Sequence, residues 1–349
     1  MSLMLEEIGQ QPGAVEKTLN EELPHAQQIR DKNKPKPPLV VLVARGTSDN
    51  AAQFGRYLLE VVAGIPVSLA APSVTTVYKR TPAWKDALVI GISQSGESTD
   101  INVCLEAARD AGAEVWGVTN EPESKMAQIA HETWLVRAGR ERSVAATKTY
   151  TGQLMAIYLI AYALGAAIDP EKLKLIAGRT SQSLALDGEV RALAERYRFM
   201  HRSVVVGRGM NYSNAFELAL KLMETCYVVA ERFSGADFAH GPIAIVERDF
   251  PAFQFAIPGP VFDGSLELAR RLRSMGAETV LFSPLTADEL GDAAVKNIVL
   301  PAAPDGDPAD LYSPIPAIVP GQLFAAHLAE VKGLDPDQPR GLQKVTKTL

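Results

Sequence analysis

The sequence has few of the residues that build disulfides, metal centres and nucleic-acid surfaces. Its only two cysteines, Cys104 and Cys226, each lie in an apolar helical pattern, so we expect core packing rather than pairing or metal binding. The five histidines are scattered, with no two at the spacing of metal ligands. A formal net charge of −6 without a basic run argues against a nucleic-acid surface. We therefore expect neither a metal nor a nucleic-acid partner.

Long apolar runs and nucleotide-binding loops are also missing. No run approaches eighteen apolar residues and no signal peptide opens the chain, so we expect a cytoplasmic protein that does not bind membranes. There is no Gly-x-x-x-x-Gly-Lys-Ser/Thr, and Gly207-Arg208-Gly209 supplies only half of a Gly-x-Gly-x-x-Gly pattern. With 47% hydrophobic and 22% charged residues, the 349 residues are typical of one large or two ordinary globular domains.

One stretch of the chain concentrates hydroxyl groups directly after a buried strand. Residues Leu88–Ile92 are apolar apart from Gly91, which predicts a strand buried on both faces of a parallel sheet. A polar turn and a helical pattern from 101 to 108 follow. Unpaired N–H groups and the helix dipole favour an anion at such a turn, and hydroxyls donate to several oxygens. The turn contains three hydroxyls and one amide that can donate in this way: Ser93, Ser95 and Ser98, and Gln94.

The simpler interpretation of these hydroxyls is helix capping, which is common for Ser and Thr. One cap needs one hydroxyl, however, and does not explain Ser93, Ser95 and Ser98 together. We favour an anion site, and neutral donors suit the phosphate of a neutral polyol better than a nucleotide.

Strands and helices alternate through the first half of the chain. Residues 1–32 have the spacing of one or two helices, and the prolines of 34–38 end them. The alternation that follows is typical of a doubly wound α/β domain. We predict strands at 39–43, near 67, and at 88–92, 115–118 and 135–136, and helices at 51–62 and 150–164.

The second half repeats this order. Strands are predicted at 203–206, 253–257 and 297–300, and a helix at 322–332. The turn Ile257-Pro258-Gly259-Pro260 replaces the hydroxyls with prolines, which have no N–H for a phosphate, so we expect this copy to have lost the anion site. The proline-rich residues 301–320 are expected to form an irregular surface loop.

The second half has chemical groups of its own. Glu217, Lys221 and Glu224 lie at i, i+4 and i+7 on one helical face, which taken alone suits a surface salt bridge. His240, before Gly241-Pro242, suits a turn residue as well as a functional one, and Lys344 suits a frayed terminus. Arg45 and Lys148 suit solvated loop charges.

Six motifs in order resemble the sugar isomerase (SIS) family, and within it the isomerase portion of the glutamine–fructose-6-phosphate aminotransferases. The motifs are Arg45-Gly46-Thr47-Ser48, Ser93-Gln94-Ser95-Gly96-Glu97-Ser98, Val144-Ala145-Ala146-Thr147-Lys148, Leu218-Ala219-Leu220-Lys221-Leu222-Met223-Glu224, Ala239-His240-Gly241-Pro242, and Asp337-Gln338-Pro339-Arg340-Gly341-Leu342-Gln343-Lys344. The resemblance implies two tandem flavodoxin-like SIS domains with parallel sheets. The expected division is an N-terminal helical segment at 1–38, a phosphate-binding domain at 39–180, a catalytic domain at 181–335 and a tail at 336–349 that carries Lys344.

The same resemblance implies roles for particular residues. Glu224 would move a proton between C1 and C2, with Glu217 and Lys221 shaping its path. His240 would assist ring opening from the other subunit of a homodimer, and Lys344 would form a Schiff base with a ketose. No cofactor is implied. Val144 and Ala146 would line the sugar, and the 6-phosphate would be held by Thr47, Ser48, Ser93, Gln94, Ser95 and Ser98.

The chain departs from that family at its start and at two positions. Residues 1–38 are too short for a glutaminase domain and contain no cysteine nucleophile, and Ala146 and Gln343 replace Ser and Ala. We therefore favour a deaminase/isomerase that converts glucosamine 6-phosphate to fructose 6-phosphate and ammonia. The synthase direction with another ammonia source and fructosamine-6-phosphate deglycation stay open, as does the physiological substrate.

A non-catalytic sugar-phosphate sensor is the hypothesis from another class. A sensor needs the anion site but not Glu224, His240 and Lys344, and all three are present. No DNA-binding helix pair or basic region accompanies them. The sequence therefore favours an enzyme.

Overall fold

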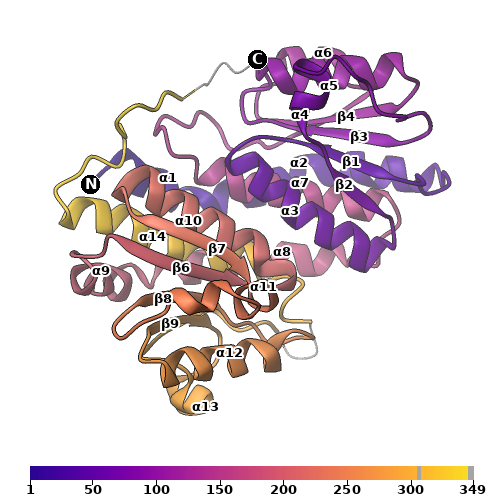
Figure 1. The fold of residues 1–349 in the computed structure, drawn as a ribbon. Helices are drawn as coiled ribbons and strands as arrows, with labels where there is room; N and C mark the ends of the chain where they lie inside the picture. The colour runs from indigo at the N-terminus through magenta and orange to yellow at the C-terminus, as the bar shows by residue number, and fades with distance from the viewer. Residues whose placement is uncertain (305–307, 345–349) are drawn as a thin grey trace. The chain divides into compact units, whose positions relative to one another are not determined.

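The computed structural model describes residues 1–304 and 308–344 and contains two compact units, each with one five-stranded sheet (Figure 1). The first-sheet unit comprises 13–142, 146–174 and the tail from 341, and the second-sheet unit comprises 1–12, 143–145 and 175–340. Every strand pairing in both sheets is parallel. The predicted class, α/β with two parallel sheets preceded by helices, is confirmed. Of the predicted tail, 345–349 lie outside the described residues.

The first sheet has the strand order β2-β1-β3-β4-β5. This order changes direction at β1 and β3, and open α/β sheets bind ligands at such a switch point. The strands are β1 (Val40–Val43), β2 (Val67–Leu69), β3 (Leu88–Ile92), β4 (Glu114–Thr119) and β5 (Glu132–Leu135).

Strand β3 lies at the centre of the first sheet and is buried along its whole length. A Cβ atom at Gly91 would lie 2.6 Å from Leu105 Cδ1, so glycine is what lets helix α5 (Thr99–Asp110) pack against the strand. Cys104 lies in a buried apolar cluster with Val89 of β3 and Leu105 of α5, so it packs in the core as predicted.

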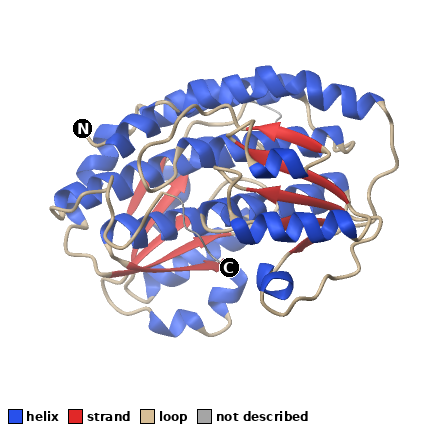
Figure 2. Cartoon of the chain, turned by 90° about the horizontal axis from the view of Figure 1, so that it is seen from above, coloured by secondary structure: helices blue, strands red, loops and turns tan. Residues whose placement is uncertain are grey.

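Helices alternate with the strands along the first half of the chain, and Figure 2 draws helices in blue and strands in red. Two expected helices near the N-terminus are confirmed as α1 (Leu3–Gly9) and α2 (Gln11–Asp31). The others that begin before residue 175 are α3 (Thr47–Leu58), with a π-helical turn at Leu59–Ala63, α4 (Pro72–Thr76), α5, α6 (Lys125–Ile129), α7 (Lys148–Ala163) and α8 (Pro170–Leu184).

Every residue of α7 is buried, which explains its nearly continuous apolar sequence. A Cβ atom at Gly152 would lie 2.5 Å from Val136 Cγ1, so α7 packs closely on the segment that follows β5. This contact fixes the start of α7, and with it the loop that precedes Lys148, relative to β5.

The second sheet has the order β10-β9-β8-β6-β7. It repeats the parallel arrangement expected from the internal repeat. Its strands are β6 (Arg202–Gly207), β7 (Val229–Ser234), β8 (Pro251–Phe255), β9 (Glu278–Ser283) and β10 (Lys296–Val299). Its helices are α9 (Asp187–Arg196), α10 (Tyr212–Cys226), α11 (Gly235–Ala239), α12 (Phe262–Ser274), α13 (Ala287–Leu290) and α14 (Pro314–Val331), with 3₁₀ turns at Gly209–Asn211, Pro242–Ile245 and Gly291–Ala293.

The prediction of an irregular surface loop over 301–320 is wrong for its last seven residues, because the buried helix α14 begins at Pro314. A proline in the first turn removes no helical hydrogen bond. Pro320 lies inside the helix and leaves the carbonyl of Pro316 without its usual N–H donor. The Ser183 hydroxyl donates to that carbonyl at 2.8 Å, which supplies the missing bond.

The turn after β8 carries no anion-binding hydroxyls, and a carboxylate packs against it. A Cβ atom at Gly259 would lie 2.7 Å from Asp310 Cγ. Burial raises the pKa of Asp310, but a carboxyl group still supplies no positive charge for an anion. The surroundings of this turn therefore disfavour phosphate.

Replacing Gly152 with Ala tests the close packing of α7. We expect Gly152→Ala to lower the free energy of unfolding by about 1–3 kcal/mol, because the new methyl group overlaps Val136. The matched control is Gly13→Ala in α2, where a Cβ meets nothing within 4 Å and helix propensity should add up to about 1 kcal/mol. Urea unfolding of both variants measures the difference, and equal effects would contradict the packing argument.

Candidate active site

The predicted phosphate residues lie at the carboxyl ends of β1 and β3. These strands are hydrogen-bonded neighbours, with Val43 opposite Gly91. Helix α3 begins at Thr47 directly after β1, and α5 begins at Thr99 after the polar turn. The structure thus brings the six predicted phosphate residues to one edge of the first sheet, where we call them the phosphate cup: Thr47, Ser48, Ser93, Gln94, Ser95 and Ser98.

Hydrogen bonds inside the cup show that its hydroxyls do more than cap α5. Ser98 occupies the N-cap position, but its side chain makes no cap hydrogen bond; its Oγ lies 3.1 Å from Ser93 Oγ instead. The Gly96 N–H donates to Ser93 Oγ at 3.2 Å, and the Glu97 N–H to Ser95 Oγ at 3.2 Å. The turn is therefore folded around its own hydroxyls, and the simple capping interpretation is wrong for Ser98.

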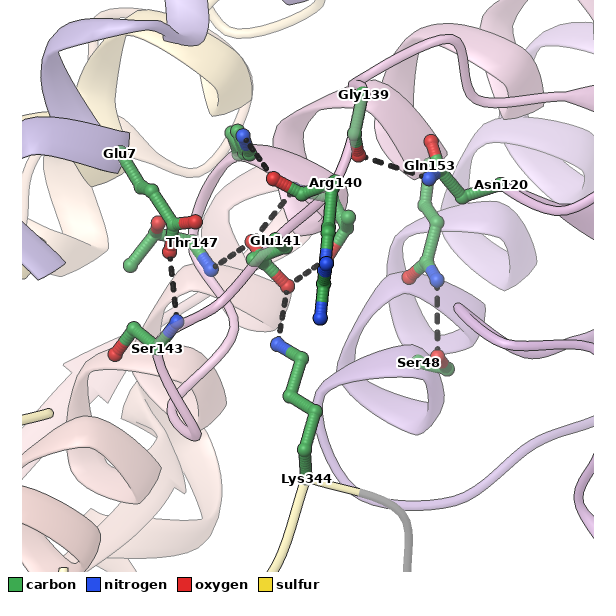
Figure 3. A network of polar contacts seen from close by, with 12 residues as sticks. Glu7, Ser48, Asn120, Gly139, Arg140, Glu141, Ser143, Thr147, Gln153 and Lys344 are labelled. Carbon is green, nitrogen blue, oxygen red and sulfur yellow. Dashed lines mark hydrogen bonds and ion pairs between the residues drawn. The ribbon is translucent and has the colours of Figure 1, made fainter. Parts of the chain in front are cut away.

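A second contact orients Ser48. Its Oγ accepts a hydrogen bond from Gln153 Nε2 of α7 at 3.0 Å (Figure 3). A hydroxyl that accepts from the protein has its own hydrogen left for a ligand. Ser48 is thus arranged as a donor.

Arg45 joins the two loops of the cup. Its Nε donates to Asp100 Oδ2 at 2.7 Å, and Asp100 is 1% exposed. Arg45 precedes Thr47 and Ser48, whereas Asp100 lies in the first turn of α5. Arg45 is half-exposed, as a solvated loop charge would be, but it also forms this ion pair with Asp100. Lys148 is buried and donates through Nζ to the Arg140 carbonyl at 2.8 Å.

Helix α10 of the second-sheet unit carries the predicted acid–base residues. Lys221 Nζ lies 2.6 Å from Glu224 Oε2 and 3.5 Å from Glu217 Oε1. The side chains of Lys221 and Glu217 are 0% exposed, and that of Glu224 is 24% exposed. The surface salt-bridge interpretation is therefore wrong. Removing charges from water is costly, and buried charge clusters of this kind occur at functional sites.

His240 and the sugar residues lie elsewhere in the chain. His240 is exposed and follows the last residue of α11, where its N–H donates to the Asp237 carbonyl at 3.2 Å. Val144 belongs to the second-sheet unit and Ala146 to the first-sheet unit, and both are partly exposed.

The loop that contains Val144 is fixed by segments distant in sequence. Glu7 Oε2 of α1 accepts the Ser143 N–H at 3.1 Å (Figure 3). The Val144 N–H donates to the Asp337 carbonyl at 3.4 Å, and both side-chain oxygens of Asp337 accept N–H groups of α1 at 2.7 Å. Helix α1 and the tail thus both hold the loop at 143–146, which we call the sugar loop because Val144 and Ala146 are predicted to line the sugar.

Lys344 is not a frayed residue in this structure. Its Nζ lies 2.8 Å from Oε2 of Glu141, a carboxylate that is fully buried (Figure 3). Burial alone would raise the pKa of Glu141, but Lys344 and the hydrogen bonds from Thr147 and Thr149 outweigh burial and lower this pKa. Sequence reasoning missed Glu141. Its position shortly before an apolar helix was the available signal, because acids are favoured at helix N-termini.

Within residues 1–304 and 308–344, no three His, Cys, Asp or Glu residues are grouped so as to hold a metal ion. In the same part of the chain, no helix has the length and apolar character needed to cross a membrane.

The paired parallel sheets and the phosphate cup define an α/β protein of the kind that binds small anionic ligands at strand ends. The SIS domain model matches residues 36–163 and 198–329, one match on each sheet, and the chain belongs to this family.

Similar proteins extend this assignment. A glutamine–fructose-6-phosphate aminotransferase (isomerizing) from Gloeobacter violaceus is 35% identical over 98% of this chain, and the chain spans 58% of its length. The C-terminal domain of the glucosamine-fructose-6-phosphate aminotransferase from Francisella tularensis has a TM-score of 0.86 at 28% identity, covering 97% of this chain and 98% of that one. A glucosamine-6-phosphate deaminase from Thermotoga maritima shares the fold, with a TM-score of 0.79 at 21% identity over 99% of this chain and 100% of that one.

Gly96 tests how closely the cup is folded. Its φ is +65°, and a Cβ there would lie 2.2 Å from Ser124 Oγ. We expect Gly96→Ala to destabilise the protein by about 2–4 kcal/mol, from backbone strain and overlap combined. Gly112→Ala is the matched control, because φ is +87° and the nearest atom is 3.8 Å away, so only strain of about 1 kcal/mol applies. Urea unfolding distinguishes them, and equal losses would contradict the overlap.

The lowered pKa of Glu141 predicts a pH-dependent stability. A carboxyl whose pKa is lower in the folded state stabilises the fold above its unfolded pKa, and this contribution disappears as the pH falls through the folded pKa. Glu141→Gln should therefore cost about 2 kcal/mol near neutral pH and progressively less below about pH 4.5. Urea unfolding of both proteins across this range measures the difference, and a cost independent of pH would contradict it.

Proposed function

We propose that this chain is a phosphosugar isomerase/deaminase that converts glucosamine 6-phosphate and water to fructose 6-phosphate and ammonia. The observation that carries the proposal is the buried Lys221 on α10, held between Glu217 and Glu224, in a member of the SIS family. The 35% identity to an aminotransferase that is named for fructose 6-phosphate supports this substrate class.

The phosphate cup binds the 6-phosphate. Ser48 supplies a donor hydrogen, and the polar turn from Ser93 to Ser98 supplies hydroxyl and N–H groups at the start of α5. Thr47, Gln94 and Ser95 complete the set. Arg45 tethers one loop of the cup to the other through Asp100.

Glu224 moves a proton between C1 and C2. It is the most exposed member of the α10 cluster, so its carboxylate is the one that a substrate reaches. Lys221 holds Glu224 at 2.6 Å, and Glu217 balances the charge of Lys221 from within the helix. One fixed carboxylate that serves adjacent carbons is the arrangement that general acid–base catalysis of this step needs.

The remaining residues act on the open-chain sugar. Lys344 forms an imine at C2 of the ketose, and Val144 and Ala146 line the carbon chain. His240 assists ring opening. Its exposure suits the expected homodimer, in which the imidazole serves the other subunit.

A sugar-phosphate sensor is the competing class of function. It would need the cup but would gain nothing from a lysine and a glutamate buried together at 0% exposure, since such charges reduce stability unless they are fully compensated. The α10 cluster therefore favours an enzyme.

Glu224→Gln tests the assignment. The change keeps the size of the side chain and removes its basic carboxylate, so we expect turnover of glucosamine 6-phosphate to fall by about 10²–10⁴-fold with substrate binding retained. Release of ammonia and fructose 6-phosphate measures turnover, and calorimetry measures binding. Glu267→Gln, an exposed change on α12, is the control and should behave like wild type.

A panel of sugar phosphates separates the alternatives. Binding without turnover by the wild type would favour the sensor, and turnover of a fructosamine 6-phosphate alone would favour a deglycase. Formation of glucosamine 6-phosphate from fructose 6-phosphate and ammonia measures the synthase direction. Unchanged turnover by Glu224→Gln would remove Glu224 from its role.

A further inference from the structure

We infer that Glu141 is the positioning residue for Lys344: its buried carboxylate fixes the amine that forms the imine. This inference rests on the proposed function, because it takes Lys344 to be the residue that reacts with the ketose. Glu141 belongs to none of the roles derived above.

The carboxylate of Glu141 is held by four donors (Figure 3). Oε1 accepts the N–H groups of Thr147 and Thr149 at 2.9 and 3.1 Å. Oε2 accepts the Thr149 hydroxyl at 2.7 Å and Lys344 Nζ at 2.8 Å. Because these N–H groups belong to the start of α7, a buried 16-residue helix, Glu141 cannot shift without breaking several bonds at once.

A lysine that acts as a nucleophile benefits from such an anchor. A lysine side chain has four rotatable bonds and loses much rotamer entropy when one position is fixed. Upstream, the tail is tied at Arg340, whose N–H donates to the Tyr227 hydroxyl at 2.9 Å and whose guanidinium lies 4.0 Å from that ring's centroid. Glu141 fixes the far end of the Lys344 side chain, where the reactive nitrogen is.

Glu141 also links the amine to the sugar loop. It precedes Val144 by three residues and Ala146 by five, and these two are the positions proposed to line the sugar. Ala146 belongs to the first-sheet unit together with Glu141 and Lys344, so the carboxylate fixes Nζ in the unit that carries this part of the segment. Fixing a nucleophile in this way lowers the entropic cost of the reaction.

The step that depends on this placement is imine formation. The Lys344 ammonium first releases a proton to solvent, and the lone pair of the resulting neutral Nζ adds to the C2 carbonyl of open-chain fructose 6-phosphate. The former carbonyl oxygen leaves as water, so one C=N bond replaces one C=O bond. Glu141 acts through Lys344 and does not itself bond to the sugar.

The alternative is that Glu141 only caps α7. A cap needs acceptors for N–H groups, which Oε1 supplies to Thr147 and Thr149, but it needs no lysine. The two roles separate experimentally. Glu141→Gln keeps an amide oxygen for the N–H groups and loses the ion pair, whereas Thr149→Val keeps the ion pair and loses one hydroxyl donor to the carboxylate.

Borohydride trapping tests the inference on the full chain. Fructose 6-phosphate and sodium borohydride should reduce the imine to a stable secondary amine at Lys344, which peptide mass spectrometry locates. We expect trapping and kcat to fall at least tenfold in Glu141→Gln, with KM changed less than threefold. In Thr149→Val both should stay within threefold of wild type.

The outcomes distinguish this inference from the function it rests on. Trapping at the wild-type rate in Glu141→Gln would overturn the positioning role alone, and an equal fall in Thr149→Val would assign Glu141 to capping. No adduct in the wild type would remove the imine and this inference with it, whereas release of ammonia measures the deaminase activity separately. If Glu141→Gln does not fold, Lys344→Met provides the test: the melting temperature should fall by about 2–4 °C, and an unchanged value would overturn the inference.

Discussion

The structure of the second-sheet unit depends on neutralising the buried positive charge of Lys221, which has no contact with solvent. Lys221 is 0% exposed, and an ammonium group buried in this way requires carboxylates beside it; those of Glu224 and Glu217 lie 2.6 and 3.5 Å from its Nζ. This requirement fixes Glu217 and Glu224 on the same face of α10 and restricts the rotamers of both. The core thus holds these three side chains more rigidly than a surface salt bridge would. Of the three, only Glu224 is in contact with solvent.

The first-sheet unit uses neutral groups for a different task. Its cup consists of hydroxyls, an amide and backbone N–H groups at the start of α5, with the Arg45–Asp100 pair joining the loops. The first-sheet unit also holds Lys344 on Glu141, so the amine proposed to react and the proposed anion site belong to one body. The two copies of one fold therefore differ at the corresponding turn: the turn after β3 carries hydroxyl donors, and the turn after β8 has prolines and a neighbouring carboxylate.

Much of the fold follows from the sequence because burial on both faces leaves a clear pattern. Strand β3 was predicted with the bounds that the structure has, and the repeat placed β6, β8 and β10 to within two residues. The beginning of α14 could not be predicted, since local rules end a helix at proline and the compensating Ser183 hydroxyl comes from 133 positions earlier in the chain. Boundaries of the domains, the dimer and the residue roles stay predictions.

The candidate site divides in the same way. The sequence motifs predicted the residues of the phosphate cup and of the α10 cluster. The burial of Lys221 and the ion pair of Arg45 with Asp100 are seen only in the structure. Glu141 was missed because its partner Lys344 lies 203 residues away, and no local pattern reports such a pair.

The central claim is that Glu224 moves the proton at C2. The direct measurement is the rate at which deuterium leaves C2 of glucosamine 6-phosphate deuterated at that carbon, at saturating substrate. The account predicts a rate at least about a hundredfold lower in Glu224→Gln than in the wild type. Equal rates in the two proteins would contradict it.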